Sequence, residues 1–380
     1  MIYLDNAASA PVSECAMAAA EPFLNGCCGN PSSIHSEGRR AALALIEARE
    51  RCAAAIGAQA DEIIFTSGGT ESDNMAIRQA LAAAESGKRR VVTTAIEHPA
   101  VLESCRYLER LGFEVEYLPV DVNGYVSAEQ AAEVITRDTA LVSVMAANNE
   151  VGTIQPVREI AEICREKGVI FHTDAVQAAG NIPLDVNELG CDMLSISAHK
   201  LGGLRGAGLL YCRRGQAVQP LIYGGGQENG LRSGTENTAA IAAMGAVMEY
   251  SSKDIRRRAD KIAEMRDRLA ELLLKIPQSR LNGGVSRRLC GNVNVSFSGV
   301  EGESLVLGLD LRGVCASSGS ACSGRNELPS HVLRAMCVPD DMLKGSLRLT
   351  ISEHNTMEEI ERAAAAAADT VQLLRSLRER

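Results

Sequence analysis

Short runs of apolar and β-branched residues alternate with longer amphipathic stretches through the middle of the chain. The strand-like runs are Ile63–Thr66, Glu114–Leu118, Met193–Ser197 and Gly208–Cys212, with three more at residues 91–94, 141–146 and 169–174. Between them lie helical patterns such as residues 70–84, in which alanine, isoleucine and leucine recur at helical spacing. This alternation predicts an α/β fold, with crossover helices covering a mainly parallel sheet.

The pattern changes near residue 236. Residues 236–276 read as long helix, and the charge-rich stretch 253–268 within it is the predicted hinge between two domains. Two strand-like alternations follow, at Asn292–Phe297 and at residues 346–351, before a closing helix for which Thr356 and Glu359 predict a capping box. The C-terminal third therefore reads as a smaller α+β domain.

Composition and charge narrow the possible functions. The 380 residues are 46% hydrophobic and 23% charged, which is typical of a globular protein. Lys and Arg total 39 against 48 Asp and Glu, and they are scattered, so we expect no nucleic-acid partner. Aromatic residues make up 3% with no Trp, which excludes aromatic cages and membrane belts.

The start of the chain and its cysteines bear on location. Asp5 and the lack of any Lys or Arg before Arg39 are the wrong charge order for a signal peptide, and no apolar run reaches the ~18 residues of a membrane span. We therefore expect a cytoplasmic protein with no membrane partner. The 12 cysteines include no C-x-x-C pair, so we expect mostly buried free thiols and no metal site.

The segment TSGGTESDN, residues 66–74, ends a predicted strand and begins a helix. Its glycines allow backbone N–H groups to approach an anion, and the helix dipole with the Thr70 hydroxyl favours a phosphate. The alternative is an ordinary strand-to-helix turn capped by Thr70.

Further polar residues follow two later strands. Asp174 and Gln177 come after one of them, and Ser197, His199 and Lys200 come at the end of the next. Because ligands of open α/β sheets bind outside the carboxyl ends of the strands, these residues can face one crevice with the 66–74 turn. A lysine, a carboxylate and an anion site are the set that pyridoxal phosphate needs. Each residue alone would be read as a solvated terminus or a cap.

With EHPAV, NNEVG, TDAVQ, SAHK, RSGTEN and SSGSAC in this order after TSGGTESDN, the chain closely resembles the cysteine desulfurases of the NifS/IscS type. These enzymes belong to the class V aminotransferase superfamily, and the similarity runs from YLDNAA to SLRLTIS. It implies the aspartate-aminotransferase-like PLP-dependent transferase fold, fold type I. We expect a large PLP-binding domain at residues 15–255, and a small domain formed by residues 1–14 and 256–380.

The resemblance also implies roles at the cofactor. Lys200 matches the lysine that forms the Schiff base with pyridoxal 5'-phosphate, and Asp174 the partner of the pyridinium nitrogen. His98 matches the imidazole that stacks on the ring and helps in proton transfer, and Gln177 would bond the phenolic oxygen. The phosphate would be bound by Gly69, Thr70, Ser197 and His199, with Thr235 reaching in from the other subunit of a homodimer.

Asn149 and Arg348 match the pair that binds the substrate α-carboxylate, and the resemblance also places Asn149 among the cofactor-binding residues. Arg348 also alternates with apolar neighbours in residues 347–351, so it is expected to leave the core face and bind a carboxylate. A surface salt bridge is the alternative.

Cys322 lies among small and turn-forming residues, which favours an exposed thiol over a buried structural one. The resemblance implies that it takes sulfur from L-cysteine as a persulfide, leaves L-alanine, and passes the sulfur to a protein acceptor. That acceptor would be an iron–sulfur scaffold or a tRNA-thiolation protein. Cys315 is expected to be a small buried strand residue, with a resolving-thiol role as the alternative. His35 and His172 also fall in the matching motifs, with structural roles as the alternative.

One turn departs from the family. Where the family has Gly-Pro-Lys-Gly, this chain has GGLRG, so Arg205 keeps the charge and Leu204 replaces the rigid proline. Three rival functions stay open: a selenocysteine lyase, a transaminase, and a cysteine-rich metal carrier. The last is disfavoured by the missing C-x-x-C spacing.

Overall fold

A computed structural model describes residues 1–318 and 329–378. Its central sheet has seven strands in the order β2-β8-β7-β6-β5-β3-β4. Their bounds are β2 Ile63–Thr66, β3 Arg90–Thr94, β4 Glu114–Leu118, β5 Thr139–Ser143, β6 Ile170–Asp174, β7 Met193–Ser197 and β8 Gly208–Cys212. β8 runs antiparallel to both of its neighbours, β2 and β7, and the other six strands run in one direction, so the predicted mainly parallel sheet is confirmed.

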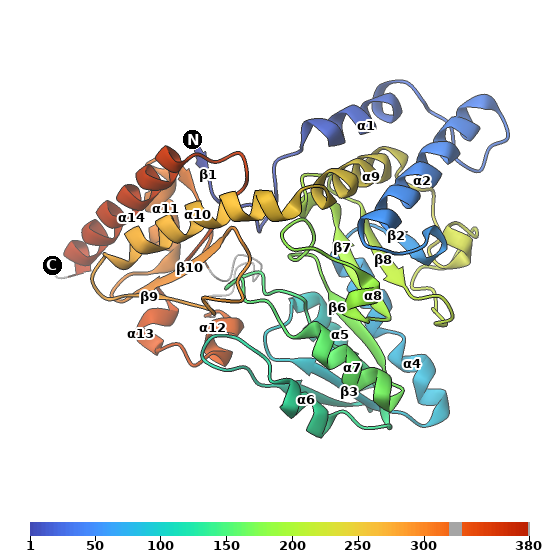
Figure 1. Ribbon diagram of the computed structural model, residues 1–380, viewed down its shortest axis with the longest axis horizontal. Helices are drawn as coiled ribbons and strands as arrows, with labels where there is room; N and C mark the ends of the chain where they lie inside the picture. Colours follow the sequence, from blue (N-terminus) through green and yellow to red (C-terminus); the bar gives the residue numbers. More distant parts are fainter. Residues whose placement is uncertain (319–328, 379–380) are drawn as a thin grey trace.

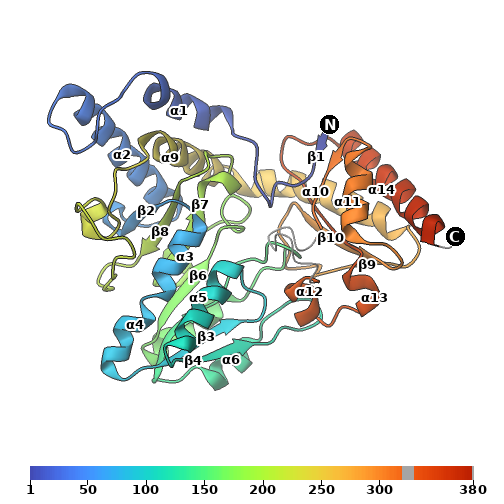
Figure 2. The same cartoon turned by 180° about the vertical axis from the view of Figure 1, so that it is seen from behind.

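Helices cover both faces of this sheet, which is why its inner strands are almost wholly buried and apolar. On one face, α2 (Ser36–Ala55), α7 (Val157–Lys167), α8 (Val186–Leu189) and α9 (Thr238–Ser252) share a core with the strands. On the other face lie α3 (Gly69–Ile77) and α5 (Pro99–Arg110). Figures 1 and 2 show these two layers from opposite sides.

A second, smaller body is built around the antiparallel sheet β12-β10-β9. Its strands are β9 Ser279–Leu281, β10 Asn292–Phe297 and β12 Ser346–Thr350, and its helices are α10 Ile255–Leu274, α11 Gly302–Asp310 and α14 Met357–Arg378. The start of the chain joins it, because β1 (Ile2–Tyr3) pairs in parallel with β11 (Val314–Cys315). Both marked termini lie on this part in Figure 1.

The two bodies have separate cores. Ile2 and Leu4 pack in the core of the small body, whereas Ala16 and Ala20 of α1 pack against α9 of the large one. This distribution supports domain boundaries near residues 14 and 255, which stay a prediction. The elements not yet given are α1 Glu14–Asn25, α4 Ala80–Ala83, α6 Ala128–Val134, α12 His331–Ala335 and α13 Asp340–Leu343, with short 3₁₀ turns between several of them.

Several predicted boundaries need correction. The helix predicted over residues 236–276 is two helices, and the break is confined to Lys253 and Asp254, where Asp254 has φ of 50°. The hinge predicted across 253–268 is therefore wrong in extent, because α10 covers most of it. The helix predicted at 70–84 is interrupted at Arg78 and Gln79, and β5 ends at Ser143 rather than 146.

Other expectations are confirmed. Thr356 and Glu359 form the predicted capping box, with hydrogen bonds of 3.1 and 3.2 Å. Most of the described cysteines are buried free thiols. Within residues 1–318 and 329–378, no helix is both long and apolar enough to span a membrane.

Candidate active site

Polar side chains gather at the carboxyl edge of the large sheet. Asp174 ends β6, and Lys200 follows β7 in the turn Ala198–Lys200. His98 follows β3, and Asn149 follows β5. Because β3, β5, β6 and β7 are parallel neighbours, the structure brings these four residues to one edge, as the sequence predicts.

The N-terminal segment, residues 5–9, completes the surroundings of Lys200. The Lys200 ammonium donates to the carbonyl oxygens of Ala7 and Ala8 at 2.6 and 2.9 Å. The Gln177 amide donates to the same Ala7 oxygen at 3.0 Å. A cavity of about 640 Å³ is lined by Lys200 and Gln177 here. Reasoning from single residues missed this segment, and the only sequence signal for it is the YLDNAA motif.

Asp174 is a buried carboxylate between two basic groups. Its Oδ1 accepts the Val176 N–H at 2.9 Å, and the side chain is 6% exposed. Burial raises the pKa of Asp174, while the nearby His98 and Lys200 oppose this shift. Burial lowers the pKa of His98, and the Asp174 carboxylate raises it. The charge states of these side chains are therefore linked.

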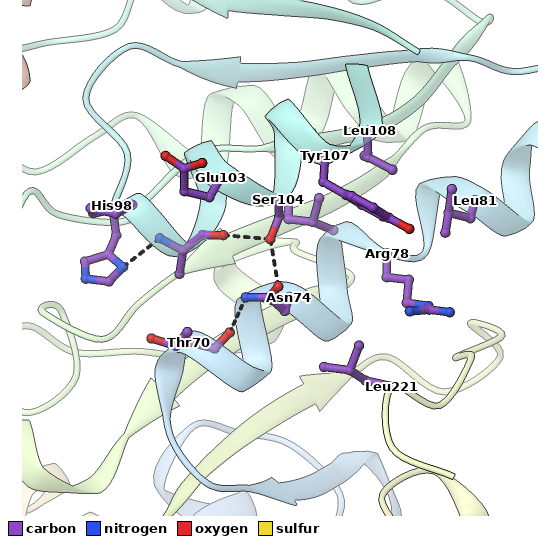
Figure 3. Close-up of a pocket in the computed structure, with 13 residues that line it drawn as sticks. Thr70, Asn74, Arg78, Leu81, His98, Glu103, Ser104, Tyr107, Leu108 and Leu221 are labelled. Carbon is purple, nitrogen blue, oxygen red and sulfur yellow. Dashed lines mark hydrogen bonds between the residues drawn. The ribbon is translucent and has the colours of Figure 1, made fainter. Parts of the chain in front are cut away.

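His98 caps α5, and this contact fixes its tautomer. Its Nδ1 accepts the Ala100 N–H at 3.1 Å, as Figure 3 shows. A neutral imidazole that accepts at Nδ1 carries its proton on Nε2, so Nε2 is the atom left for proton exchange. The ring lines a cavity of about 440 Å³ between α3 and α5, with Thr70 near the same end.

In the turn before α3, glycines let the backbone lie close to neighbouring segments of the chain. A Cβ on Gly208 would lie 2.5 Å from the Gly68 Cα, and one on Gly69 would lie 2.7 Å from the Val176 side chain and 3.7 Å from the Ser197 Cβ. Gly68 is the N-cap of α3 and contributes no side chain, so capping by Thr70 is wrong. Thr70 is exposed instead. This leaves the first turn of α3 suited to an anion.

Two other residues that are expected to bind the phosphate, His199 and Thr235, lie in different parts of the structure. His199 Nδ1 pairs with Ser9 Oγ at 3.3 Å, and burial first of all lowers the pKa of His199 to about 4. Arg205 also donates to Ser9 Oγ, at 3.2 Å. Thr235 is exposed and lines a different cavity, of about 230 Å³, with Gly206. The chain by itself does not bring Thr235 to Lys200.

Arg348 is buried, at 2% exposed, and it connects the small sheet to the site. Its Nη2 donates to Asp5 Oδ1 at 3.0 Å, and its Nη1 donates to the Asn149 carbonyl oxygen at 3.2 Å. Its Nε is buried without a hydrogen-bond partner among the described residues. A surface salt bridge is therefore wrong, and Asp5 is a partner that the sequence reasoning missed. The alternation in β12 could place Arg348, but no local pattern signals its ion pair with a residue 343 positions earlier.

The remaining residues singled out in the sequence are two cysteines, two histidines and Leu204. Cys322 lies outside the described residues. Cys315 lies in β11, as expected, but it is half-buried rather than buried. His35 caps α2 through its Nδ1, and His172 is fully buried between Ser143 and Ser195 at 2.9 Å to each hydroxyl. Both of these histidines have structural contacts. Leu204, the family departure, packs half-buried beside α1 and α9.

Residues 2–363 match the sequence model of the family described as "Aminotransferase class-V". The chain belongs to the class V aminotransferase family. Among the members it resembles is "Cysteine desulfurase IscS" of Dictyoglomus turgidum, 47% identical over 99% of this chain and 96% of that protein. A second, of the same name and from Methanosarcina thermophila, is 46% identical over 99% and 93%.

Solved structures of similar proteins agree with the fold. A "NIFS-LIKE PROTEIN" superposes with a TM-score of 0.92 at 36% identity, covering 98% of this chain and 99% of that one. "SspA in complex with cysteine" has a TM-score of 0.83 at 34% identity, covering 94% and 100%. The expected NifS-like, PLP-transferase architecture is confirmed.

Proposed function

We propose that this protein is a cysteine desulfurase, which removes sulfur from L-cysteine and releases L-alanine. The observation that carries the proposal is that Lys200, Asp174 and His98 meet at one sheet edge, with Arg348 reaching it from the small body. Relatives named cysteine desulfurase, similar over nearly the whole chain, support this assignment. The structural relative that was solved with cysteine supports the choice of substrate.

Pyridoxal 5'-phosphate is the proposed cofactor, and the residues present fit it. Lys200 would bind it covalently, the buried Asp174 would pair with its ring nitrogen, and Gln177 would bond its phenolic oxygen. A Cβ on Gly69 would lie 2.7 Å from the Val176 side chain, so glycine lets the first turn of α3 lie close to the end of β6, where its N–H groups would bind the phosphate. When bound, the cofactor withdraws electrons from the substrate's α-carbon.

The chain's own groups then bind the substrate and move protons. Arg348 and Asn149 bind the α-carboxylate, for which the buried guanidinium supplies charge-assisted donors. His98 exchanges a proton through Nε2, since Nδ1 is occupied by Ala100. Burial lowers the pKa of His98, and the nearby Asp174 carboxylate opposes this shift, so the proton on the imidazole depends on the charge of Asp174.

The sulfur step uses the Cys322 thiol as nucleophile. The bond between the substrate's Cβ and sulfur breaks, and a bond between that sulfur and the Cys322 sulfur forms. The Cβ keeps the electron pair of the broken bond and takes up one proton, equivalent to the one that the thiol gives up, so it is reduced to the methyl group of alanine while the sulfur is oxidised to the persulfide level. One cysteine and one thiol thus give one alanine and one Cys322 persulfide, with no external oxidant.

Two partners belong to the same proposal. A second copy of the chain would supply Thr235 to the phosphate site, because Thr235 lies away from Lys200 within one chain. A protein acceptor, either an iron–sulfur scaffold or a tRNA-thiolation protein, would receive the persulfide sulfur.

Visible spectroscopy of the purified protein tests the cofactor assignment. The wild type should show the band of a protein-linked pyridoxal phosphate and change colour with L-cysteine. Lys200→Ala should remain folded and lack the band, because Lys200 is the only lysine in the sequence between β7 and β8. Lys344→Ala, at an exposed position in the small body, is the control and should keep it. A protein-linked band in Lys200→Ala would contradict the assignment.

A further inference from the structure

Two active-site turns lie side by side at the sheet edge. We call residues 95–98 the His98 turn and residues 144–152 the Asn149 turn. The Glu97 carboxylate accepts the Met145 N–H at 2.9 Å, and the Asn148 amide donates to the Ile96 carbonyl oxygen at 2.9 Å. The two turns are therefore joined to each other at their base.

Helix α12 of the small body packs across both turns. Its buried apolar residues share one cluster with residues of both turns: Val332, Leu333 and Met336 with Ile96, Met145 and Val151. Such apolar contacts hold the helix in place, but they do not fix its register as directional hydrogen bonds do. The residues that can fix the register are the polar ones at its start.

Ser330, the N-cap of α12, binds the Asn149 turn. Its hydroxyl donates to Glu150 Oε2 and accepts the Leu333 N–H at 3.1 Å. Ser330 is 4% exposed and Glu150 is 5% exposed. Burial raises the pKa of Glu150 to about 7, while the Ser330 hydroxyl and Arg348 lower it. The Glu150 carboxylate thus lies between the helix cap and the arginine expected to bind substrate.

His331, the next residue, binds the His98 turn. Its Nε2 pairs with the Glu97 carbonyl oxygen at 3.0 Å, so this nitrogen carries a proton and donates. The contact is made to the residue directly before His98. His331 also lies close enough to His98 that a charge on it would lower the pKa of His98. Burial lowers the pKa of His331, and the nearby Arg106 lowers it further, while the hydrogen bond to the Glu97 carbonyl oxygen opposes both.

We propose that Ser330 and His331 are positioning residues for the desulfurase reaction, each holding one active-site turn. His331 places the imidazole that moves the proton, and Ser330 places the turn that binds the substrate carboxylate. The inference rests on the proposed function. It assigns different kinetic effects to two adjacent residues of one short helix.

The two roles predict different kinetic effects, one on kcat and the other on KM. His331→Phe removes the donor to Glu97, so kcat should fall about tenfold while the KM for L-cysteine stays within about twofold. Ser330→Ala removes the donor to Glu150, so KM should rise about fivefold to tenfold with a smaller change in kcat. His331→Gln and Ser330→Thr keep a donor at each place and should restore most of the loss. Arg334→Ala, at an exposed position of the same helix, is the matched control.

Hydrogen exchange of the cofactor-free protein gives a readout that does not need catalysis. His331→Phe should speed exchange of the Ala100 amide about fivefold, since it is bonded to His98. Ser330→Ala should instead speed exchange of the Glu150 and Val151 amides, both of which are bonded to Asn148. Each variant should leave the other turn close to wild type.

The outcomes separate the inference from the proposed function. Selective exchange changes without any alanine formation by the wild type would refute the desulfurase assignment and keep the positioning roles. An active wild type with unchanged kinetics in His331→Phe and Ser330→Ala would overturn the inference. Equal losses in the four variants at Ser330 and His331, with a common fall in Tm, would also overturn it, because they would indicate that these residues only support α12.

Discussion

Replacing Arg348 by Met removes a buried cation while keeping much of the side-chain length. Arg348 is 2% exposed and holds Asp5 at 3.0 Å and the Asn149 carbonyl oxygen at 3.2 Å. A hydrogen bond to a charged group contributes about 1.5–3 kcal/mol. Loss of the guanidinium's grip on the substrate carboxylate, at about 3 kcal/mol, should therefore lower kcat/KM about a hundredfold.

The same substitution should also destabilise the fold. Breaking a buried ion pair by removing one partner costs about 3–5 kcal/mol. Because the Asp5 side chain is 19% exposed, water can solvate part of the remaining carboxylate. We therefore expect a loss near the lower end, about 3 kcal/mol, in the free energy of unfolding. Urea unfolding measures it.

A second variant separates the two effects. Adding Asp5→Asn to Arg348→Met removes the unpaired charge, so the stability should partly return. The kcat/KM for alanine formation should stay low, because the carboxylate-binding cation is still missing. A single variant that keeps kcat/KM within about twofold of wild type would refute the reasoning, and so would a double variant that recovers stability and activity together.

Gly208→Ala should destabilise the protein by about 1–3 kcal/mol in urea unfolding, because the new Cβ would lie 2.5 Å from the Gly68 Cα, a backbone atom between β2 and α3. Unchanged stability would contradict this close approach. Burial raises the pKa of Glu97 from its ordinary 4.5 to about 8. The folded state thus keeps a proton that the unfolded state releases, so this stabilisation is complete below pH 4.5 and is lost as pH rises through 8. Glu97→Gln should flatten the decline of the free energy of unfolding over that range, and an undiminished slope would count against a buried neutral Glu97.

The sequence predicted the strands best, because their signal is local. Most strands of the central sheet are short buried runs rich in apolar residues, with the edge strand β4 as the exception, and six of the seven keep the parallel arrangement that alternating helices require. The break in the helix predicted at 70–84 was not predictable in this way. There the Gln79 side-chain amide donates to the Met75 carbonyl oxygen at 2.6 Å. The same amide group donates to the Gln219 carbonyl oxygen at 3.2 Å and accepts the Gln219 N–H at 2.8 Å, and Gln219 lies far along the chain.

The candidate site shows the same division. Asp174 and Lys200 could be placed because Asp174 ends one strand and Lys200 lies in the turn after the next, and the carboxyl ends of parallel strands share an edge. Asp5 could not be placed as the partner of Arg348, since the contact depends on how the start of the chain packs on the small sheet. The roles of Ser330 and His331 depend on the same kind of distant packing. Sequence patterns predict which residues react, whereas their hydrogen-bond and ion-pair partners depend on tertiary packing.

The most direct test of the account follows the sulfur itself. Purified wild type treated with L-cysteine should release alanine, and the peptide that contains Cys322 should gain the mass of one sulfur atom. Cys322→Ala should still change colour with L-cysteine but form almost no alanine, because the nucleophile is missing. Cys315→Ala, the matched control in the half-buried strand β11, should lose little. Wild-type alanine formation by Cys322→Ala would contradict the account.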